Sequence, residues 1–246
     1  MKKQLLALAA LGLLAGAAQA QSSFEGFYGQ LATGYESNQA SSLGATGVNV
    51  GQTNNDTWNT PNQNFNGMPL VAGLGYNWSI ASNYMLGLGA DYSFLSVKSG
   101  TFSSPGAGNA TGATLNGQQL QVSNRTNIYL TPGYALTKDQ LVYLKAGYST
   151  VSLQQTFPNS VNNGPGKGGN TISYTNGNPS NTLQGYIVGL GYKQMITGGF
   201  YGFAEANYMS YSKQSFSATT TNGSYILSNN PSLSTYQALV GVGYKF

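Results

Sequence analysis

From residue 26 to the end of the chain, apolar and polar residues alternate at period two in eight segments separated by turn-rich stretches. This period puts successive side chains on opposite faces of a β-strand, and segments of about ten residues are typical of strands that cross a bilayer. None of the segments shows the three-four spacing of an amphipathic helix. The expected strands are residues 26–36, 68–78, 84–97, 122–136, 141–153, 183–196, 200–213 and 233–246.

The connections between these segments alternate in length along the chain. The long ones are residues 37–67, 98–121, 154–182 and 214–232, and the short ones are 79–83, 137–140 and 197–199. An up-and-down barrel threaded through a bilayer produces this alternation, because tight turns lie on one side and extended loops on the other. We therefore predict an all-β fold: an eight-stranded antiparallel up-and-down transmembrane β-barrel with short periplasmic turns and four long extracellular loops.

Charged residues of the predicted strands share one parity with glycine and asparagine, whereas the other parity is apolar. Because an Arg or Lys that faces lipid at mid-membrane costs about 2–4 kcal/mol, the charged parity should point inward. Lys193 has this parity, and we expect a network of charges inside the barrel at Asp91, Arg125, Lys145 and Glu205. Two interpretations remain open: a plug of ion pairs that fills a narrow interior, or a gate whose pairs exchange to admit ions or small solutes.

A Gly-x-Gly-Tyr unit recurs where even-numbered strands end, at residues 73–76, 189–192 and 241–244, with Gly133-Tyr134 as a shorter version. Each copy precedes a short turn or the end of the chain, so the tyrosines should lie at one height. The predicted periplasmic aromatic girdle is Tyr76, Trp78, Tyr134, Tyr192, Tyr244 and Phe246. The predicted outer ring is Tyr35, Phe94, Tyr148 and Tyr208.

The first twenty residues differ from the rest. Lys2 and Lys3 precede an apolar run that begins at Leu5, and the stretch ends in Ala18-Gln19-Ala20, the small-residue form of a secretory cleavage site. We predict that residues 1–20 are a cleaved signal peptide and that residues 21–246 form the barrel domain. After residue 20 no apolar run approaches the 18 or more residues of a transmembrane helix.

Composition agrees with a surface that is partly not exposed to water. Only 7% of residues are charged, against about a quarter in soluble proteins. Removal of Lys2 and Lys3 leaves 8 basic against 6 acidic residues, a net charge of +2, so we expect no nucleic-acid partner. The absence of Cys and His and the few carboxylates indicate neither a metal nor a cofactor.

With these features the chain resembles the small outer-membrane β-barrels of the superfamily that includes the OmpA transmembrane domain and the opacity-type proteins. The most specific element is the last strand, which ends on Phe246 and carries Tyr244, Val242 and Val240 on the same parity. In that superfamily such a strand is engaged by the outer-membrane assembly machinery. The resemblance implies the outer membrane of a Gram-negative cell, with lipid and lipopolysaccharide as neighbours.

The resemblance also bears on activity. Enzymatic barrels of similar architecture, the palmitoyltransferase, deacylase, phospholipase and aspartyl-type protease barrels, use a histidine that this chain lacks, so we expect no catalysis. The long loops are polar and nearly neutral, and their aromatics either contact carbohydrate or another surface, such as a host ligand, or pack the loops together. Those aromatics are Trp58, Phe65, Phe102, Phe157, Tyr174 and Tyr225. We predict a structural or surface-interaction role, with a narrow porin-like channel as the alternative.

Overall fold

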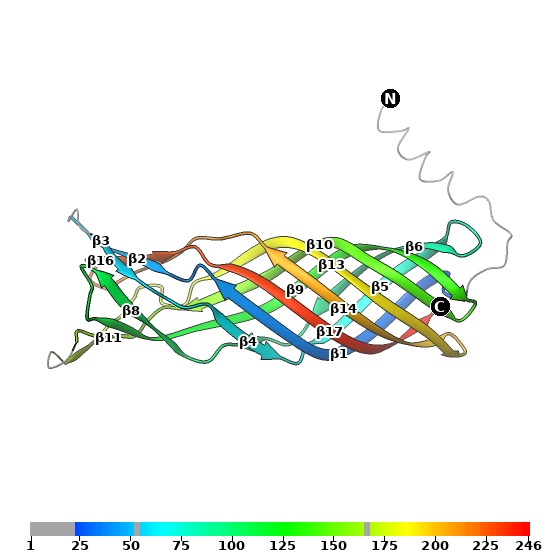
Figure 1. Cartoon of the computed structure of the whole chain (residues 1–246), viewed down its shortest axis with the longest axis horizontal. Helices are drawn as coiled ribbons and strands as arrows, with labels where there is room; N and C mark the ends of the chain where they lie inside the picture. The colour runs from blue at the N-terminus through cyan, green and yellow to red at the C-terminus, as the bar shows by residue number, and fades with distance from the viewer. Residues whose placement is uncertain (1–22, 52–54, 165–167) are drawn as a thin grey trace, which may run out of the picture.

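Eight long antiparallel strands close into a barrel in the computed structural model, which describes residues 23–51, 55–164 and 168–246. The predicted signal peptide lies outside the described residues. Each long strand pairs with the next, and the last pairs back onto the first from Tyr28↔Lys245 to Ser41↔Ser232 (Figure 1). The eight are β1 Gly26–Ser41, β5 Leu70–Ser79, β6 Tyr84–Ser93, β9 Thr114–Thr137, β10 Gln140–Thr156, β13 Ser180–Thr197, β14 Phe200–Tyr211 and β17 Ser232–Lys245. The predicted eight-stranded antiparallel barrel is confirmed.

The predicted strand ends are accurate on the side of the short turns and wrong on the other side. There β1 continues to Ser41 rather than 36, and β9 begins at Thr114 rather than 122. The predicted strand 84–97 is too long, because β6 ends at Ser93, and nine short strands lie in the predicted loops or, for Val97, at the end of that strand. These are β2 Ala45–Asn49, β3 Asn55–Trp58, β4 Gln63–Gly67, β7 Val97–Lys98, β8 Phe102–Gly108, β11 Ser160–Asn162, β12 Gly169–Thr171, β15 Phe216–Thr219 and β16 Tyr225–Asn229.

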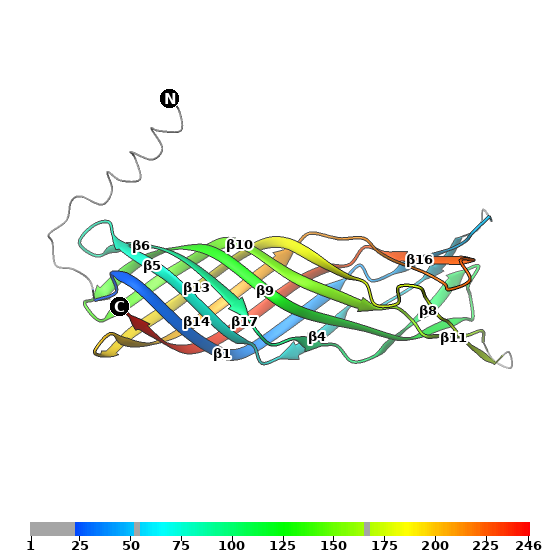
Figure 2. The same ribbon diagram turned by 180° about the vertical axis from the view of Figure 1, so that it is seen from behind.

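Seven of the short strands build a second ring of backbone hydrogen bonds beyond the barrel, which we call the loop lobe. On one side β9 pairs with β8, β8 with β3, β3 with β2, β2 with β16 and β16 with β15; on the other side β9 pairs with β11, and β11 with β12. The ring closes where the chain after β12 meets β15: Thr175 N–H donates to Thr219 O and Thr221 N–H to Ser173 O, both at 2.9 Å. The loop lobe lies at the opposite end of the molecule from the C-terminus (Figures 1 and 2).

The distribution of apolar side chains reverses between the barrel and the loop lobe. On β10, Lys145 points inward and Leu144 outward, whereas farther along the same strand Leu153 points inward and Gln154 outward. Parity does not change between these positions, so the strand is continuous and only the chemistry of its two faces is exchanged. One apolar cluster fills the interior of the loop lobe and extends into the barrel at Ile187 and Met209. Its other members include Leu43, Trp58, Phe65, Val97, Leu115, Leu120, Val122, Val151, Leu153, Phe157, Leu183, Phe216, Leu227 and Leu233.

The outer wall of the barrel is apolar. Leu74, Leu144, Leu190 and Val240 are each more than 60% exposed, as a lipid-facing surface requires. Across the described strands, no charged side chain shares this outward parity below the loop lobe. The described residues also contain no helix that is long and apolar enough to cross a membrane.

Candidate functional site: the charged interior of the barrel

Lys145 holds two carboxylates together in the middle of the barrel. Its Nζ lies 2.9 Å from Asp91 Oδ2 and 2.8 Å from Glu205 Oε1, so that β6, β10 and β14 are joined through one ammonium group. Asn127 Nδ2 donates to Asp91 at 2.6 Å, and Asn207 Nδ2 donates to Glu205 at 2.7 Å. All of these side chains are buried. We call Asp91, Lys145 and Glu205 the lysine group.

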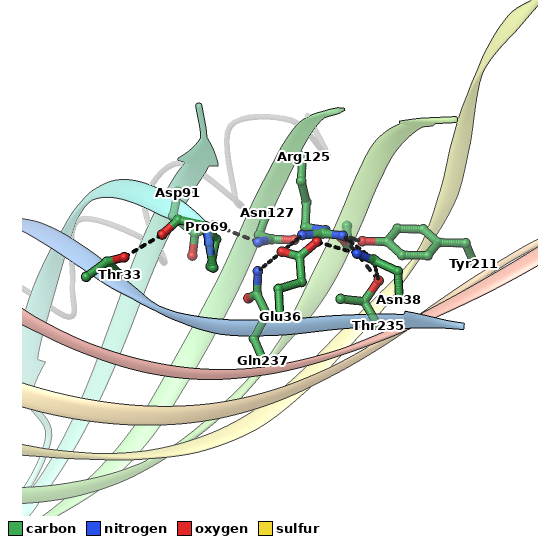
Figure 3. Close-up of polar contacts among 11 residues, drawn as sticks. Thr33, Glu36, Asn38, Pro69, Asp91, Arg125, Asn127, Tyr211, Thr235 and Gln237 are labelled. Carbon is green, nitrogen blue, oxygen red and sulfur yellow. Dashed lines mark hydrogen bonds and ion pairs between the residues drawn. The ribbon is translucent and has the colours of Figure 1, made fainter. Parts of the chain in front are cut away.

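Arg125 forms a separate ion pair nearer the loop lobe. Its Nη1 pairs with Glu36 Oε2 on β1, and its Nε donates to Tyr211 Oη at 3.0 Å (Figure 3). Its Nη2 lies 3.2 Å from Asn38 Oδ1 and 3.2 Å from Thr235 Oγ1. Gln237 Nε2 donates to Glu36 at 2.7 Å. Glu36 and Arg125 form the arginine group, which crosses the barrel from β1 to β9.

A β-bulge aims Arg125 into the barrel. The pairing of β9 with β10 shifts between Thr150↔Thr126 and Ser152↔Ser123, and Asn124 has a φ of 52°. Tyr92 Oη donates to Asn124 Oδ1 at 2.9 Å, which fixes the bulged residue on the outer face. Because the bulge adds one residue, Val122 and Arg125 both point inward although three positions separate them.

The structure thus brings Asp91, Lys145 and Glu205 together and places Arg125 apart from them. Its partner, Glu36, is absent from the predicted network, although Glu36 has the inward parity of Gly34 and ends the predicted first strand. The inward parity of Glu36 on the first predicted strand is the signal from which its place in the network could have been predicted. The predicted single network is therefore two groups at different depths.

Lys193 is a third buried cation, on β13, that the predicted network also omitted. Its Nζ lies 4.1 Å from the ring centroid of Tyr28, 5.0 Å from that of Tyr201 and 5.3 Å from that of Tyr143. Within the described chain, no carboxylate lies at ion-pair distance from Lys193. Three ring faces therefore stabilise this ammonium, each contributing about 0.5–2 kcal/mol.

Inward glycines make room for these rings. A Cβ on Gly191 would lie 2.3 Å from Tyr143 Cζ, and a Cβ on Gly243 would lie 2.2 Å from Tyr201 Cζ. Both glycines belong to the recurring Gly-x-Gly-Tyr unit, so one unit places a tyrosine outside the wall and makes room inside for a tyrosine of the paired neighbouring strand. The rings pack in an apolar cluster at the short-turn end, with Phe24, Ala32, Val71, Met85, Leu141, Phe203 and Leu239.

Outward aromatic side chains contact one another near the short turns. Tyr76 and Trp78 rings lie 4.8 Å apart, and Tyr244 and Phe246 rings lie 5.2 Å apart. Tyr134 packs on Tyr84. Tyr192 Oη donates a hydrogen bond to Gln194 Oε1 at 2.7 Å. All six residues predicted as a periplasmic girdle are partly or largely exposed on this wall, and three aromatics that the prediction omitted lie beside them, at Phe27, Tyr84 and Phe200.

The sequence from residue 6 to residue 246 matches the family described as the outer membrane protein beta-barrel domain. The chain belongs to this family. Its place is therefore the outer membrane, as the resemblance implied, and the loop lobe is the extracellular end of the molecule. No curated protein sequence matches the chain.

Solved structures of outer membrane proteins are distantly similar to this family member. Ail, the attachment invasion locus protein of Yersinia pestis, is 12% identical with a TM-score of 0.39, over 90% of this chain and 99% of that one. The outer membrane protease OmpT from Escherichia coli is 12% identical with a TM-score of 0.47, over 93% and 99%. The outer membrane protein OprG from Pseudomonas aeruginosa is 12% identical with a TM-score of 0.46, over 90% and 96%. The family assignment rests on the sequence match alone.

The aromatic residues of the extracellular loops pack against each other. Trp58, Phe65 and Phe157 are buried in the loop lobe, and Phe102, Tyr174 and Tyr225 pack against the same cluster. Trp58 Nε1 donates to Tyr225 Oη at 3.0 Å, and Tyr225 Oη donates to Asp56 Oδ2 at 2.9 Å. Burial, and to a smaller extent Asp56, raises the pKa of Tyr225, so its hydroxyl remains a donor at neutral pH. The sequence left open whether these aromatics contact a partner or pack the loops together; in the structure they pack the loops together.

Metal-ligating side chains are scattered. In the described ranges no three His, Cys, Asp or Glu residues lie close enough to hold a metal ion.

Proposed function

We propose that this outer-membrane barrel has a non-catalytic, structural or surface-interaction role and that its interior does not conduct ions. The observation that carries the proposal is the filling of the interior along its length. From the short-turn end toward the loop lobe, the described side chains form an apolar cluster, the lysine group, the arginine group and a second apolar cluster. Each ion pair is almost fully buried, and an eight-stranded barrel is just wide enough for side chains to fill.

Conductance of the purified barrel in planar bilayers tests the closed interior. We expect no channel openings from the wild-type protein at neutral pH and moderate voltage. Regular, voltage-dependent single-channel steps from protein with the heat-modifiable gel mobility of a folded barrel would contradict the proposal. Boiled protein is the control.

The alternative is a gated channel, and the position of Lys193 is the observation that favours it. Lys193 is a buried cation without an ion-paired carboxylate, and its strand is paired with the strand that carries Glu205. A shift of Glu205 from Lys145 toward Lys193 would replace one ion pair by another. Arg125→Ala and Lys145→Ala each remove one cation from the interior, so the gate predicts conductance in at least one of them, and continued absence of conductance in both eliminates it.

The extracellular face suggests which partners such a barrel contacts. Asp56 is the one charged side chain on the seven described strands β2, β3, β8, β11, β12, β15 and β16, and it is bonded to Tyr225. The outward positions of these strands are mostly Thr, Ser, Asn and Gly. A surface of this composition suits neutral, hydroxyl-rich partners such as saccharides of lipopolysaccharide or of a host surface, because these seven strands offer an ionic partner almost no charge; the exposed cations Lys98 and Lys213 lie outside them.

Binding of the detergent-solubilised barrel to immobilised polysaccharides tests this choice of partner. We expect retention on a neutral polysaccharide that changes little with salt, and no retention on a sulfated one. Thr57→Arg and Ser217→Arg introduce charge on two outward positions of the loop lobe and should weaken retention on the neutral matrix. Ser82→Arg, in a periplasmic turn, is the matched control. Retention on the sulfated matrix alone would contradict the proposal.

The C-terminal strand and the aromatic rings have roles that we also propose from the family. Phe246 N–H donates to Phe27 O at 2.9 Å, so the last residue is held against β1. The ending in Phe246 suits recognition by the assembly machinery. The aromatic residues at both ends of the apolar wall suit the two surfaces of a membrane made of lipid and lipopolysaccharide. Phe246→Ser should lower the amount of folded protein in the outer membrane, and an unchanged amount would contradict this role.

A further inference from the structure

Two carboxylates share one ammonium group in the middle of the barrel. Lys145 Nζ lies 2.9 Å from Asp91 Oδ2 and 2.8 Å from Glu205 Oε1, and the three side chains are at most 5% exposed. The ring of Tyr129 covers the ammonium group, with its centroid 3.9 Å from Nζ. Lys193, a second buried cation, has no carboxylate at ion-pair distance among the described residues. One cation therefore holds two anions, and the other cation holds none.

The two carboxylates of the lysine group are held by different numbers of donors. Glu205 accepts three hydrogen bonds: on Oε1 from Lys145 and from Asn207, and on Oε2 from Tyr143 Oη at 2.8 Å. Asp91 accepts two, one from Lys145 and one from an asparagine of β9. Because each donor stabilises a carboxylate, Glu205 is the better-supported anion of the two.

The surroundings of Lys145 and Asp91 favour a reaction between them. A site closed to solvent penalises both charges and protects an amide product from hydrolysis. Groups that are fixed in contact react as if they were present at about 10⁵–10⁸ M. Asn127 Nδ2 donates to Asp91 Oδ1 at 2.6 Å, so it stabilises the negative charge that develops on this oxygen when a nitrogen attacks the carbon.

We propose that Lys145 and Asp91 condense in the folded barrel to an isopeptide bond, with Glu205 as the proton carrier. Glu205 takes one proton from the ammonium group before the amine attacks Asp91 Cγ, and a second proton from the attacking nitrogen afterwards. Both protons pass to the departing oxygen, which leaves as water when its C–O bond breaks. One ammonium and one carboxylate thus become one amide and one water molecule, Glu205 is unchanged, and no other reactant is needed.

The charges that remain after this reaction are matched. Amide formation removes one cation and one anion, which leaves Glu205 for Lys193. Glu205 is paired with Gly191 across β14 and β13, two residues from Lys193. The released water also has suitable acceptors, since Asn127 Oδ1 and Asn207 Oδ1 are buried and have no hydrogen-bond partner among the described residues.

The amide links β6 to β10 across β9, which pairs with both. It closes a covalent ring through residues 91–145 in a chain that has no cysteine and so can form no disulfide. Such a ring restricts the unfolded chain, and unlike an ion pair it survives boiling in detergent. The proposal is independent of conductance, because the interior is filled with or without the bond.

The mass of the denatured protein tests the bond. Barrel isolated from outer membranes should be lighter than its chain by one water molecule. Chain that is produced unfolded and refolded into vesicles should begin at full mass and lose that water with time, because the ion pair precedes the amide. Full mass in the membrane-derived barrel overturns the proposal, and this measurement needs no variant.

Peptide mapping locates the bond. Trypsin should fail to cut after Lys145 and should yield a branched peptide in which residues 139–167 are joined to the segment that ends at Lys98 and contains Asp91. Normal cleavage after Lys145, or a branch to the segment that contains Glu205, contradicts the assigned bond.

Variants separate the three roles. Lys145→Arg keeps a cation that cannot form this amide and should stay at full mass, whereas Lys138→Arg, in an exposed turn, is the matched control and should lose water. Asp91→Asn should reach the same final mass as the wild-type protein, because ammonia leaves in place of water. Glu205→Gln removes the proton carrier and should slow the loss by about 10²–10⁴-fold. Loss of water from folded Lys145→Arg protein, or an unchanged rate in Glu205→Gln, is decisive against the mechanism.

Discussion

The barrel and the loop lobe distribute apolar and polar side chains differently between their outer surface and their interior. In the barrel the outside is apolar and the interior holds ion pairs next to an apolar cluster at the short-turn end, whereas in the loop lobe the outside is mostly neutral and polar and the interior is an apolar cluster without ion pairs among its described residues. The outside differs because lipid replaces water around the barrel: the hydrophobic effect removes apolar side chains only from a surface that water would otherwise cover. One continuous strand can therefore turn an apolar outer face toward lipid along one part of its length and a polar outer face toward water along the next.

The largest effect is expected in the lysine group. Lys145→Met leaves Asp91 and Glu205 buried without their cation, which should lower the free energy of unfolding by about 3–5 kcal/mol. Urea unfolding of the barrel in lipid vesicles measures this. Adding Asp91→Asn and Glu205→Gln to the same protein should restore most of the loss, because no charge is then left unpaired. A loss under about 1 kcal/mol for Lys145→Met would show that the lysine group is not desolvated.

The interior of the loop lobe should respond to cavities as a soluble core does. Leu153→Ala removes a fully buried side chain from the apolar cluster and should cost about 2–5 kcal/mol. Ser152→Ala, at the neighbouring outward position, should change the stability by less than about 0.5 kcal/mol. Protease resistance of the loop lobe as a function of temperature is the measurement. Equal effects of the two substitutions would mean that the loop lobe is not packed around Leu153.

The same substitution to arginine, made at two outward positions of β10, distinguishes the lipid-facing wall from the loop lobe. Leu144→Arg places a cation toward lipid and should cost about 2–4 kcal/mol, less if the side chain reaches a membrane surface. Gln154→Arg places the same cation toward water and should change the stability by less than about 0.5 kcal/mol. Urea unfolding of both variants in the same vesicles provides the comparison. A cost at Gln154 that matches the cost at Leu144 would extend the lipid-facing wall into the loop lobe.

The smallest of these effects is expected where rings meet inward glycines. Gly191→Ala forces Tyr143 to move and should cost about 1–3 kcal/mol, since the rings around it are closely packed. Gly100→Ala, with open space around its Cβ, is the control and should be nearly neutral. The midpoints of denaturant unfolding of the two variants measure this difference in stability. A Gly191→Ala protein as stable as the control would remove the explanation given for the Gly-x-Gly-Tyr unit.

The reversal also explains what could be predicted from the sequence. The search for apolar residues on one parity follows β10 through Leu144 but loses the pattern where Ser152 and Gln154 replace apolar residues, so the predicted strands end near the upper edge of the lipid-facing wall. Beyond this edge apolar and polar residues still alternate, but the apolar residues now point inward, as Leu120 and Val122 do on β9. Short strands such as β7 offer too few residues for any period to be detected.

The site was predictable as far as strand parity determines it. Parity places Asp91, Lys145 and Glu205 inside, but which charges meet depends on the tilt and stagger of strands around a closed wall, which no local pattern contains. Glu36 lies on β1, whose outward row is interrupted by Gly29 and Thr33. The tyrosine rings around Lys193 come from β1, β10 and β14, so their convergence is a property of the closed barrel.

The central claim is that the lipid-facing wall ends within β10 while the strand continues, and nitroxide accessibility along that strand tests it most directly. Spin labels at outward positions 144, 148, 152 and 154, in vesicles, report collision with oxygen, which concentrates in lipid, and with a water-soluble nickel complex. We expect oxygen to dominate at 144, the nickel complex to dominate at 152 and 154, and the crossover to fall near Tyr148. Dominance of oxygen at position 154 would contradict the account.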